Sequence, residues 1–482
     1  MPYVRQLTAF PYSPEEGDVM EQIAAPKELS GKICGRQKEK VIPYRFSRTC
    51  LRIPCEDGEL WYNCLTGELI YLLPSETDHV FDSETGNSIR CELISRWFLV
   101  PEDHDEYAHG QQVRKLVQLY GMRDSAVTDF TVFPTTDCNA RCFYCYELGR
   151  PRVNMSVQIA EDVAGYIKKV SLGQDVKIRW FGGEPLFNMS AIDTVCHGLR
   201  TGDVGFVSQM TTNGYLFDKA TVDRAKNDWN LSAVQITLDG TEEVYNRTKA
   251  YIYIGVNAYE KVMQNIGLLL DAEIAVHIRL NMNRKNDEDL YRLSDELAER
   301  FRGRRGFGVY VHQLMDFGRE VYAHNDELEG LDAVMKLKDY LYELGIGGYT
   351  GLSRKVKYNQ CMADNDKSVT ILPDGRIGKC EHESEEKLVG SIYGTEIDRD
   401  MIKGWKETLD IPECRECALS PSCIKLKCCS WNTRGCTETD RLKMKKTLEY
   451  QALREYRRFR DGSSGAAPDP GSDDMWAGGQ TL

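Results

Sequence analysis

Three cysteines, Cys138, Cys142 and Cys145, follow one another with the spacing CxxxCxxC in the segment 135–146. Thiolates this close on one loop can bind one face of a four-iron cube and leave the fourth iron without a protein ligand. Such an open iron is a place where a cofactor or substrate can bind, so the spacing indicates chemistry. The alternative is a zinc knuckle, but zinc sites usually assemble from pairs such as CxxC and need four ligands. The spacing therefore favours an iron–sulfur cluster over zinc.

A second group of cysteines lies near the end of the chain, with little apolar sequence between its members. The group consists of Cys361, Cys380, Cys414, Cys417, Cys423, Cys428, Cys429 and Cys436. Core packing does not account for this density, so we expect cluster ligands here, although four cysteines also suit zinc. By contrast, the cysteines before residue 125 are irregularly spaced, which favours small buried side chains.

Glycines and polar residues stand at the ends of several predicted strands. Gly182 and Gly183 allow close approach of the backbone to a ligand, with Glu184 beside them. Polar residues at or near the ends of later strands are Asn213, Thr237, Asp239, Arg279 and Asn281. Arg279 and Asn281 share one face of their strand because side chains alternate with period two. Gly182, Gly183 and Glu184 are therefore candidates for contact with a ligand.

The elements that must position these residues alternate between strand and helix. The predicted strands are Asp129–Phe133, Val176–Phe181, Gly205–Thr211, Ala233–Leu238, Ala275–Met282 and Phe307–Gln313. Helical stretches such as Gln158–Val170 and Tyr259–Leu270 separate them. Units of this kind predict an α/β fold with a parallel sheet, curled as a partial (β/α)6 TIM-like barrel. Functional residues are then expected at the carboxyl ends of the strands.

The regions on either side of the barrel have other patterns. Residues up to about 125 combine a hairpin signal at Asp57–Gly58 with two later helical patterns, which predicts a small α+β module. Val369–Cys380 predicts a hairpin with an Asp-Gly turn that presents Cys380 at a strand end. Asp440–Phe459 is expected to form a basic helix outside the barrel, and Asp461–Leu482 to be disordered.

Composition limits the expected partners and cellular location of the protein. Among 482 residues, Lys+Arg 61 against Asp+Glu 74 gives a net charge of −13, which disfavours nucleic acid as a partner. No apolar run approaches a membrane span, and the first residues lack a signal-peptide pattern. With 17 cysteines and no export signal, we expect a cytoplasmic protein whose cysteines bind metal rather than form disulfides.

The cysteine loop, with aromatic Tyr144 directly before its last cysteine, resembles the cluster loop of radical S-adenosylmethionine (radical SAM) enzymes. In that family the open iron of a [4Fe-4S] cluster binds S-adenosylmethionine, and one electron cleaves this cofactor to a 5′-deoxyadenosyl radical. The cofactor supplies the difficult chemistry and the protein positions it.

Further motifs extend this resemblance. Trp180–Pro185 contains the family's GGEP motif, which holds the amino group of the cofactor, and 211–215 is similar to its TNG motif. Residues 236–240 resemble the S-x-D-G segment, with Thr237 at the serine position. By resemblance Arg279 and Asn281 reach the cofactor's ribose or carboxylate, while an internal salt bridge is the alternative for Arg279. The family's H-D-x-x-R stretch is altered at 245–249, so no role is assigned to Lys249.

The second cysteine group resembles the SPASM domain, the C-terminal extension of radical SAM enzymes that modify peptides and proteins. By this resemblance one auxiliary cluster is bound by Cys414, Cys417, Cys423 and Cys436. A second is bound by Cys361, Cys380 and either Cys428 or Cys429, because the usual CxxxC step is missing here. The resemblance thus implies two auxiliary [4Fe-4S] clusters.

These observations divide the chain into expected parts. They are an N-terminal module (1–125), a radical SAM partial barrel (126–345), a SPASM domain (346–440), a C-terminal helix (441–460) and a tail (461–482). The N-terminal module resembles winged-helix elements that bind a leader peptide as an added strand, and a structural cap is the alternative. Together they indicate a maturase that crosslinks a precursor peptide through thioether or carbon–carbon bonds, with flavodoxin or ferredoxin as reductant.

Two other functions stay open. A sulfatase-type maturase would form formylglycine on a protein, and a non-catalytic iron–sulfur electron carrier would not need GGEP or an open iron. Glu381 follows Cys380 directly, and sulfatase maturases can hold a catalytic carboxylate at the corresponding position. We expect its strand end to face the barrel mouth, where the carboxylate would serve as general base. The alternative is a solvated residue in the acidic run 381–386.

Overall fold

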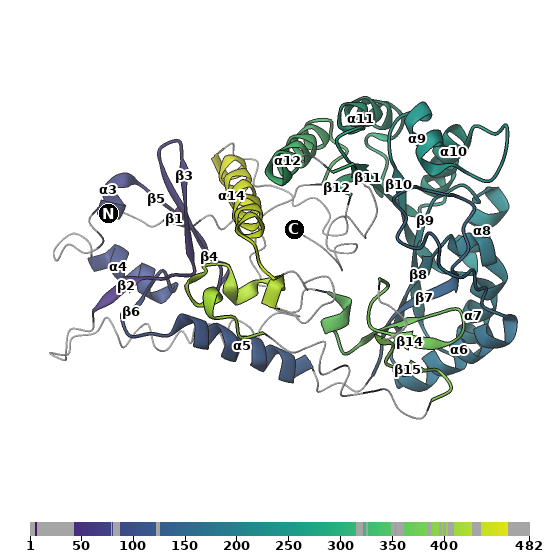
Figure 1. Ribbon diagram of the computed structural model, residues 1–482, viewed down its shortest axis with the longest axis horizontal. Coiled ribbons are helices and arrows are strands. Elements are labelled where there is room, and N and C mark those ends of the chain that lie inside the picture. Colours follow the sequence, from purple (N-terminus) through teal and green to yellow (C-terminus); the bar gives the residue numbers. More distant parts are fainter. Residues whose placement is uncertain are drawn as a thin grey trace.

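The computed structural model describes residues 5–6, 43–78, 80, 87–121, 126–314, 322–323, 326–348, 352, 361–382, 387–394, 398, 402, 409–426 and 435–460. Figure 1 shows a β-rich N-terminal part at one end of the molecule, a barrel-like sheet with outer helices at the other, and helix α14 (Glu438–Arg460) between them. Cys428, Cys429 and the expected disordered tail lie outside the described residues. No helix in the described ranges is long and apolar enough to cross a membrane.

The barrel sheet contains the predicted parallel strands, in the spatial order β12-β11-β10-β9-β8-β7. Their bounds are β7 (Asp129–Thr135), β8 (Val176–Gly182), β9 (Phe206–Thr212), β10 (Leu231–Leu238), β11 (Ala275–Met282) and β12 (Phe307–Gln313). Within the described residues β11 is the one strand beside β12, which otherwise forms an isolated bridge from Val309 to Gly347, so the sheet is open rather than closed. The predicted α/β class and partial barrel are therefore confirmed.

Helices cover the outer face of this sheet (Figure 1). They are α6 (Val157–Ser171), α7 (Met189–Thr201), α8 (Lys219–Asn227), α9 (Glu242–Lys249), α10 (Ala258–Asp271), α11 (Asp287–Phe301) and α12 (Glu327–Glu343). In α6, Ser156 caps the first turn by accepting a hydrogen bond from the Ile159 amide, and Ala160, Val163 and Ile167 are buried at helical spacing. Because helices and barrel interior bury both faces of the sheet, Val132, Ile178 and their neighbours form one apolar core.

The C-terminal hairpin extends the same sheet. Strands β13 (Ser368–Ile371), β14 (Arg376–Gly378) and β15 (Gly390–Ser391) follow β7 in the sheet order. β13 runs parallel to β7, and the predicted Asp-Gly turn contains Gly375 at φ 82°, a conformation that favours glycine. β14 is antiparallel to β13 and so runs against β7, whose carboxyl end carries the cysteine loop. β14 itself therefore runs away from the barrel mouth, and the position of Glu381 depends on the residues that follow the strand.

The N-terminal module is an antiparallel sheet with helices, in the order β1-β5-β4-β3 beside a β2–β6 pair. Its elements are β1 (Arg5–Gln6), β2 (Tyr44–Phe46), β3 (Cys50–Cys55), β4 (Gly58–Asn63), β5 (Leu69–Leu72), α3 (Pro74–Asp78), α4 (Asn87–Ser95), β6 (Leu99–Pro101) and α5 (Glu106–Gly121). The predicted turn at Asp57–Gly58 joins β3 to β4. Residues 99–101 form β6, which pairs with β2.

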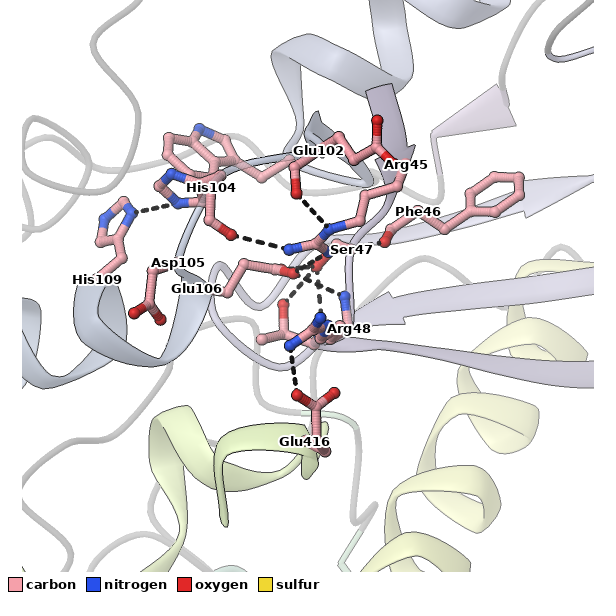
Figure 2. A network of polar contacts seen from close by, with 12 residues as sticks. Arg45, Phe46, Ser47, Arg48, Glu102, His104, Asp105, Glu106, His109 and Glu416 are labelled. Carbon is pink, nitrogen blue, oxygen red and sulfur yellow. Dashed lines mark hydrogen bonds and ion pairs between the residues drawn. The ribbon is translucent and has the colours of Figure 1, made fainter. Parts of the chain in front are cut away.

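A polar network fastens α5 to this module, as Figure 2 shows. The Glu106 side chain is 4% exposed and accepts hydrogen bonds from Arg45 Nη1 at 2.6 Å and from the Arg48 backbone amide at 2.9 Å. Arg48 Nη1 in turn lies 2.6 Å from Glu416 Oε1 in the cysteine-rich segment (Figure 2). The network thus links the N-terminal module to residues more than three hundred positions later in the chain.

One hydrophobic core joins this module to the cysteine-rich segment and α14. It contains Leu69 and Tyr71 of β5 together with Cys414, Cys423 and Tyr456. The basic helix α14 lies outside the barrel sheet as expected, and it packs on α12 on one side and on β3 and β4 on the other. The short 3-10 turns η4 (Pro412–Glu416), η5 (Ser420–Ser422) and η6 (Ile424–Leu426) carry the cysteines into this core.

Candidate active site

The cysteine loop follows β7 and brings its thiols together. The Cys145 amide donates to the Cys142 carbonyl at 3.1 Å, and the Ala140 amide donates to Cys138 Sγ at 3.4 Å. Burial raises the pKa of Cys138 to about 12 and that of Cys142 to about 11, and the neighbouring thiols add to both effects. Buried thiols this close are poor thiolates alone, whereas a cationic iron centre would stabilise the deprotonated form. The donor set therefore fits an iron–sulfur cluster.

The two glycines after β8 allow close contact with this loop. The Gly183 amide donates to the Thr135 carbonyl at 3.1 Å, and the Glu184 amide donates to the Asp137 carbonyl at 2.9 Å. A Cβ on Gly182 would lie 2.3 Å from the Thr135 oxygen, and one on Gly183 would lie 2.2 Å from the Asp137 oxygen. Only glycine fits there, so the close approach expected from sequence is made to the cysteine loop itself.

Glu184 lies beneath that loop and is 1% exposed. Its Oε1 accepts from the Thr212 hydroxyl at 2.7 Å, and its Oε2 accepts from the Asn213 amide at 2.8 Å. Burial raises the pKa of Glu184 to about 7, although these hydrogen bonds oppose the shift. The carboxyl group thus connects the end of β8 to the turn after β9.

Asn213 connects the same turn to the cysteines. Its Nδ2 donates to Asn139 Oδ1 at 2.6 Å and lies 3.9 Å from Cys138 Sγ. Asn139 was not singled out in the sequence, although it stands inside the CxxxCxxC motif. Thr237 is half-buried on β10, opposite Arg279 in the parallel register.

A chain of hydrogen bonds joins the remaining candidates across the barrel. The Tyr144 hydroxyl donates to Asp239 Oδ1 at 2.9 Å, and Asn281 Nδ2 donates to the same oxygen at 3.4 Å. Arg279 Nε donates to Asn281 Oδ1 at 3.0 Å. Within the described part of the chain Arg279 makes no ion pair, so the internal salt bridge is not found there. The predicted residues are therefore brought together.

Lys249, to which sequence reasoning assigned no role, belongs to this group. Its Nζ lies 3.1 Å from Asp239 Oδ2 and 3.0 Å from the Tyr144 hydroxyl, and its side chain is 4% exposed. The available signal was its place at the end of the altered H-D-x-x-R stretch. Like Asn139, this buried lysine beside the cysteine loop is a residue that the motifs alone do not reveal.

Glu381 is not a solvated residue, because its side chain is only 14% exposed. Its Oε2 is buried without a hydrogen-bond partner among the described residues, and its Oε1 lies 3.8 Å from His382 Nδ1. The His382 ring lies 4.6 Å from the Tyr146 ring of the cysteine loop. Ligand atoms of Cys380, Glu381 and His382 lie within 4.8 Å of one another and could hold a metal ion. The residues after β14 therefore reach the cysteine loop in spite of the strand direction.

The later cysteines form a separate group near the N-terminal module. Burial raises the pKa of Cys423 to about 11, and the neighbouring thiols of Cys417, Cys436 and Cys414 each raise it further. Cys361 and Cys380 lie elsewhere in the chain, before β13 and after β14 of the hairpin. The division of these cysteines into two ligand sets stays a prediction, and Cys428 and Cys429 lie outside the described residues.

Comparisons with known proteins agree with the barrel assignment. Residues 132–297 match the family model described as the radical SAM superfamily. A probable GTP 3′,8-cyclase of Archaeoglobus fulgidus is 23% identical over 295 residues, which cover 58% of this chain and 93% of that protein. A probable GTP 3′,8-cyclase of Methanococcus vannielii is 32% identical over 114 residues, 23% of this chain and 37% of its own length.

Two solved structures share the fold more broadly. The structure of polyhistidine-tagged anSMEcpe with bound AdoMet has a TM-score of 0.55 and 16% identity, over 70% of this chain and 96% of that chain. The structure of Streptococcus suis SuiB has a TM-score of 0.51 and 15% identity, over 82% of this chain and 97% of that chain. At these identities the likeness shows the fold alone.

Proposed function

Because this chain contains a radical SAM domain, we propose that it is a maturase of a ribosomally made peptide. It would cleave S-adenosylmethionine reductively and crosslink side chains of the peptide through thioether or carbon–carbon bonds. The observation that carries the proposal is the convergence of the three buried thiols with Glu184 and the Tyr144–Asp239 pair. An electron carrier would need only the thiols.

The residues around the loop have separate roles in this proposal. Cys138, Cys142 and Cys145 would hold a four-iron cluster and leave one iron open. The cofactor would be bound by Tyr144, Gly182, Gly183, Glu184, Asn213, Thr237, Asp239, Arg279 and Asn281. When bound, the cluster and S-adenosylmethionine supply a 5′-deoxyadenosyl radical that takes a hydrogen atom from the substrate. The chain's own groups orient the cofactor in a buried site, where polar contacts are stronger than in water.

Two observations support a peptide substrate. A structural neighbour, native anSMEcpe, has been solved with bound AdoMet and the Cp18Cys peptide at a TM-score of 0.54. The N-terminal module offers an antiparallel sheet to which a leader could add as a strand. The cysteine groups at Cys361–Cys380 and Cys414–Cys436 would hold two auxiliary clusters, with flavodoxin or ferredoxin as reductant.

A formylglycine-forming maturase is the second candidate, because of Glu381. Its buried oxygen without a partner and its place near the cysteine loop suit a general base that takes a substrate proton. In a crosslinking enzyme the same carboxylate would deprotonate a substrate thiol. The product therefore distinguishes the two functions, and the residue alone does not.

Anaerobic reaction with a short cysteine-rich peptide encoded beside the gene tests the proposal. With S-adenosylmethionine and dithionite we expect 5′-deoxyadenosine and a peptide that has lost two hydrogens per crosslink, seen by mass spectrometry. The Cys138, Cys142 and Cys145→Ala triple variant is the control and should form no 5′-deoxyadenosine while it keeps its C-terminal iron. Cofactor cleavage by this variant would refute the assignment.

The type of bond follows from two further measurements on the same reaction. Alkylation counts the free cysteines of the product, and unmodified cysteines throughout would exclude the thioether. Glu381→Gln should slow crosslinking yet leave 5′-deoxyadenosine formation intact, because the carboxylate would act only on the substrate. GTP in place of the peptide serves as a control and should give no cyclised product.

A further inference from the structure

Lys249, Asp239 and Tyr144 form a buried charged triad from three elements. Lys249 ends α9, Asp239 follows β10, and Tyr144 belongs to the cysteine loop. The ammonium lies 3.1 Å from the carboxylate and 3.0 Å from the hydroxyl, and the hydroxyl lies 2.9 Å from the carboxylate. The side chains of Lys249 and Asp239 are 4% and 1% exposed. Each member therefore holds the other two in place.

Burial of such an ion pair costs desolvation free energy, so the pair is weak evidence for a purely stabilising role. The desolvation cost of two buried charges often equals or exceeds their mutual attraction, and apolar residues can fill the same space at no loss of stability. Further hydrogen bonds here satisfy the carboxylate, since Asn281 Nδ2 also donates to Asp239 Oδ1 at 3.4 Å. The carboxylate thus keeps the ammonium charged and in one position.

That position is beside the cysteine loop. Lys249 Nζ lies 3.0 Å from the hydroxyl of Tyr144, which stands between Cys142 and Cys145 in the loop. The Lys249 carbonyl accepts a hydrogen bond from the Arg141 amide at 2.8 Å, between Cys138 and Cys142 in the loop. The lysine is thus connected to the loop through both its backbone carbonyl and its ammonium group.

We propose that Lys249 is an electrostatic positioning residue that raises the reduction potential of the cluster bound by Cys138, Cys142 and Cys145. The inference rests on the proposed function, which places the cluster there. Reduction adds one electron from dithionite or a protein donor and makes the cluster more negative by one unit. A fixed positive charge beside a ligand thiolate stabilises the reduced state more than the oxidised state. The lysine ammonium suits this task because it is a compact charge.

Potentiometric titration followed by electron paramagnetic resonance tests this in the full-length, anaerobically reconstituted protein. The signal of the loop cluster is identified as the one that is missing from the Cys138, Cys142 and Cys145→Ala variant. Lys249→Met removes the charge, whereas Lys249→Gln removes the charge but keeps donors for Asp239 and Tyr144. We expect both to disfavour reduction at least tenfold, about 59 mV for one electron. Lys249→Arg should restore most of the shift.

Lys261→Met is the matched control. Lys261 lies on α10 with its ammonium 4.0 Å from the centre of the Tyr215 ring, outside the cysteine loop, and its loss lowers the net charge equally. This variant should leave the potential unchanged, and an equal shift would overturn the proposal. An unchanged potential in Lys249→Gln would also overturn it, as would loss of the loop signal from both neutral variants, which would indicate a purely structural role. Absence of the loop signal from the unaltered protein would instead refute the proposed function.

Discussion

Glu184 shows how a single buried carboxyl group connects stability to the site. It is 1% exposed, and its pKa is raised by burial to about 7, although Thr212, Asn213 and Leu186 donate hydrogen bonds to it. Ionisation of Glu184 at this buried position is unfavourable by itself, and a cationic group beside it would make the ionised form more favourable. The GGEP motif is expected to bring such a group, the amino group of the cofactor, to this carboxylate.

The raised pKa predicts a pH dependence of the free energy of unfolding. Between the ordinary value near 4.5 and about 7, the native state keeps a proton that the unfolded state has lost, so stability falls as pH rises. The full effect is on the order of 3 kcal/mol. Glu184→Gln should remove this part of the slope when the metal-free protein is unfolded in urea at pH 5 and pH 8.

Glu147 provides the comparison for this experiment. Burial also raises the pKa of Glu147 to about 7, so it contributes a slope of the same sign. Glu147→Gln should remove its own share and leave the share of Glu184. If Glu184→Gln keeps the whole slope of the unaltered protein, the carboxyl group is not buried as described.

At the scale of elements, α5 holds the loop that carries the later cysteines. Arg114 of α5 is 1% exposed, and its Nη2 donates to the carbonyls of Ser420 at 3.2 Å, Pro421 at 3.0 Å and Cys423 at 3.4 Å. A guanidinium that binds several carbonyls fixes the backbone on either side of Cys423. The helix therefore positions a candidate ligand that lies far away in the sequence.

Arg114→Met should lower the iron content of the Cys414–Cys436 group while the loop at Cys138 keeps its cluster. Each lost hydrogen bond to a charged donor costs about 1.5–3 kcal/mol, and the carbonyls stay buried. Iron and sulfide analysis after mild chelation measures the loss. The neighbouring exposed Lys115→Met is the control on the same helix. Equal iron in both variants would show that the loop does not need α5.

At the scale of the molecule, the N-terminal sheet has two apolar faces with different partners. One face, with Leu69 and Tyr71, packs on the later cysteines and α14. The other, with Trp61 and Ile70, packs on α4 and β6 within the module. A leader-binding module that could be deleted without effect on the rest of the protein would not share a hydrophobic core with the later cysteines. Deletion of the residues before about 127 would therefore expose the cysteine group as well as remove a leader site.

Two adjacent substitutions on β5 separate these effects. Leu69 and Ile70 are both 0% exposed, and truncation of either to Ala should destabilise the module by about 2–5 kcal/mol. Only Leu69→Ala opens the face against the cysteines, so only this variant should lose iron from the Cys414–Cys436 group on chelation. Loss of iron from both variants in proportion to their stability would mean that the shared core is not specific to that group.

The local pattern of the sequence was sufficient to predict the barrel. Its strands lie within two residues of their predicted bounds because parallel strands buried on both faces are short apolar runs between amphipathic helices. The GGEP glycines were also recognisable, since a positive φ at Gly182 and close backbone contacts exclude other residues. Motif, strand and turn were thus determined by neighbours in the chain.

Contacts between distant segments decided the rest. Lys249 meets Tyr144 across 105 positions, and α5 meets Cys423 across 309. Composition suggested that Glu381 lies in solvent, yet the chain after β14 buries it near the cysteine loop. The burial and charge of such groups depend on which elements pack together, and no local pattern encodes this. The sequence by itself therefore determined the motifs and the barrel, whereas the tertiary structure decided which charges surround them.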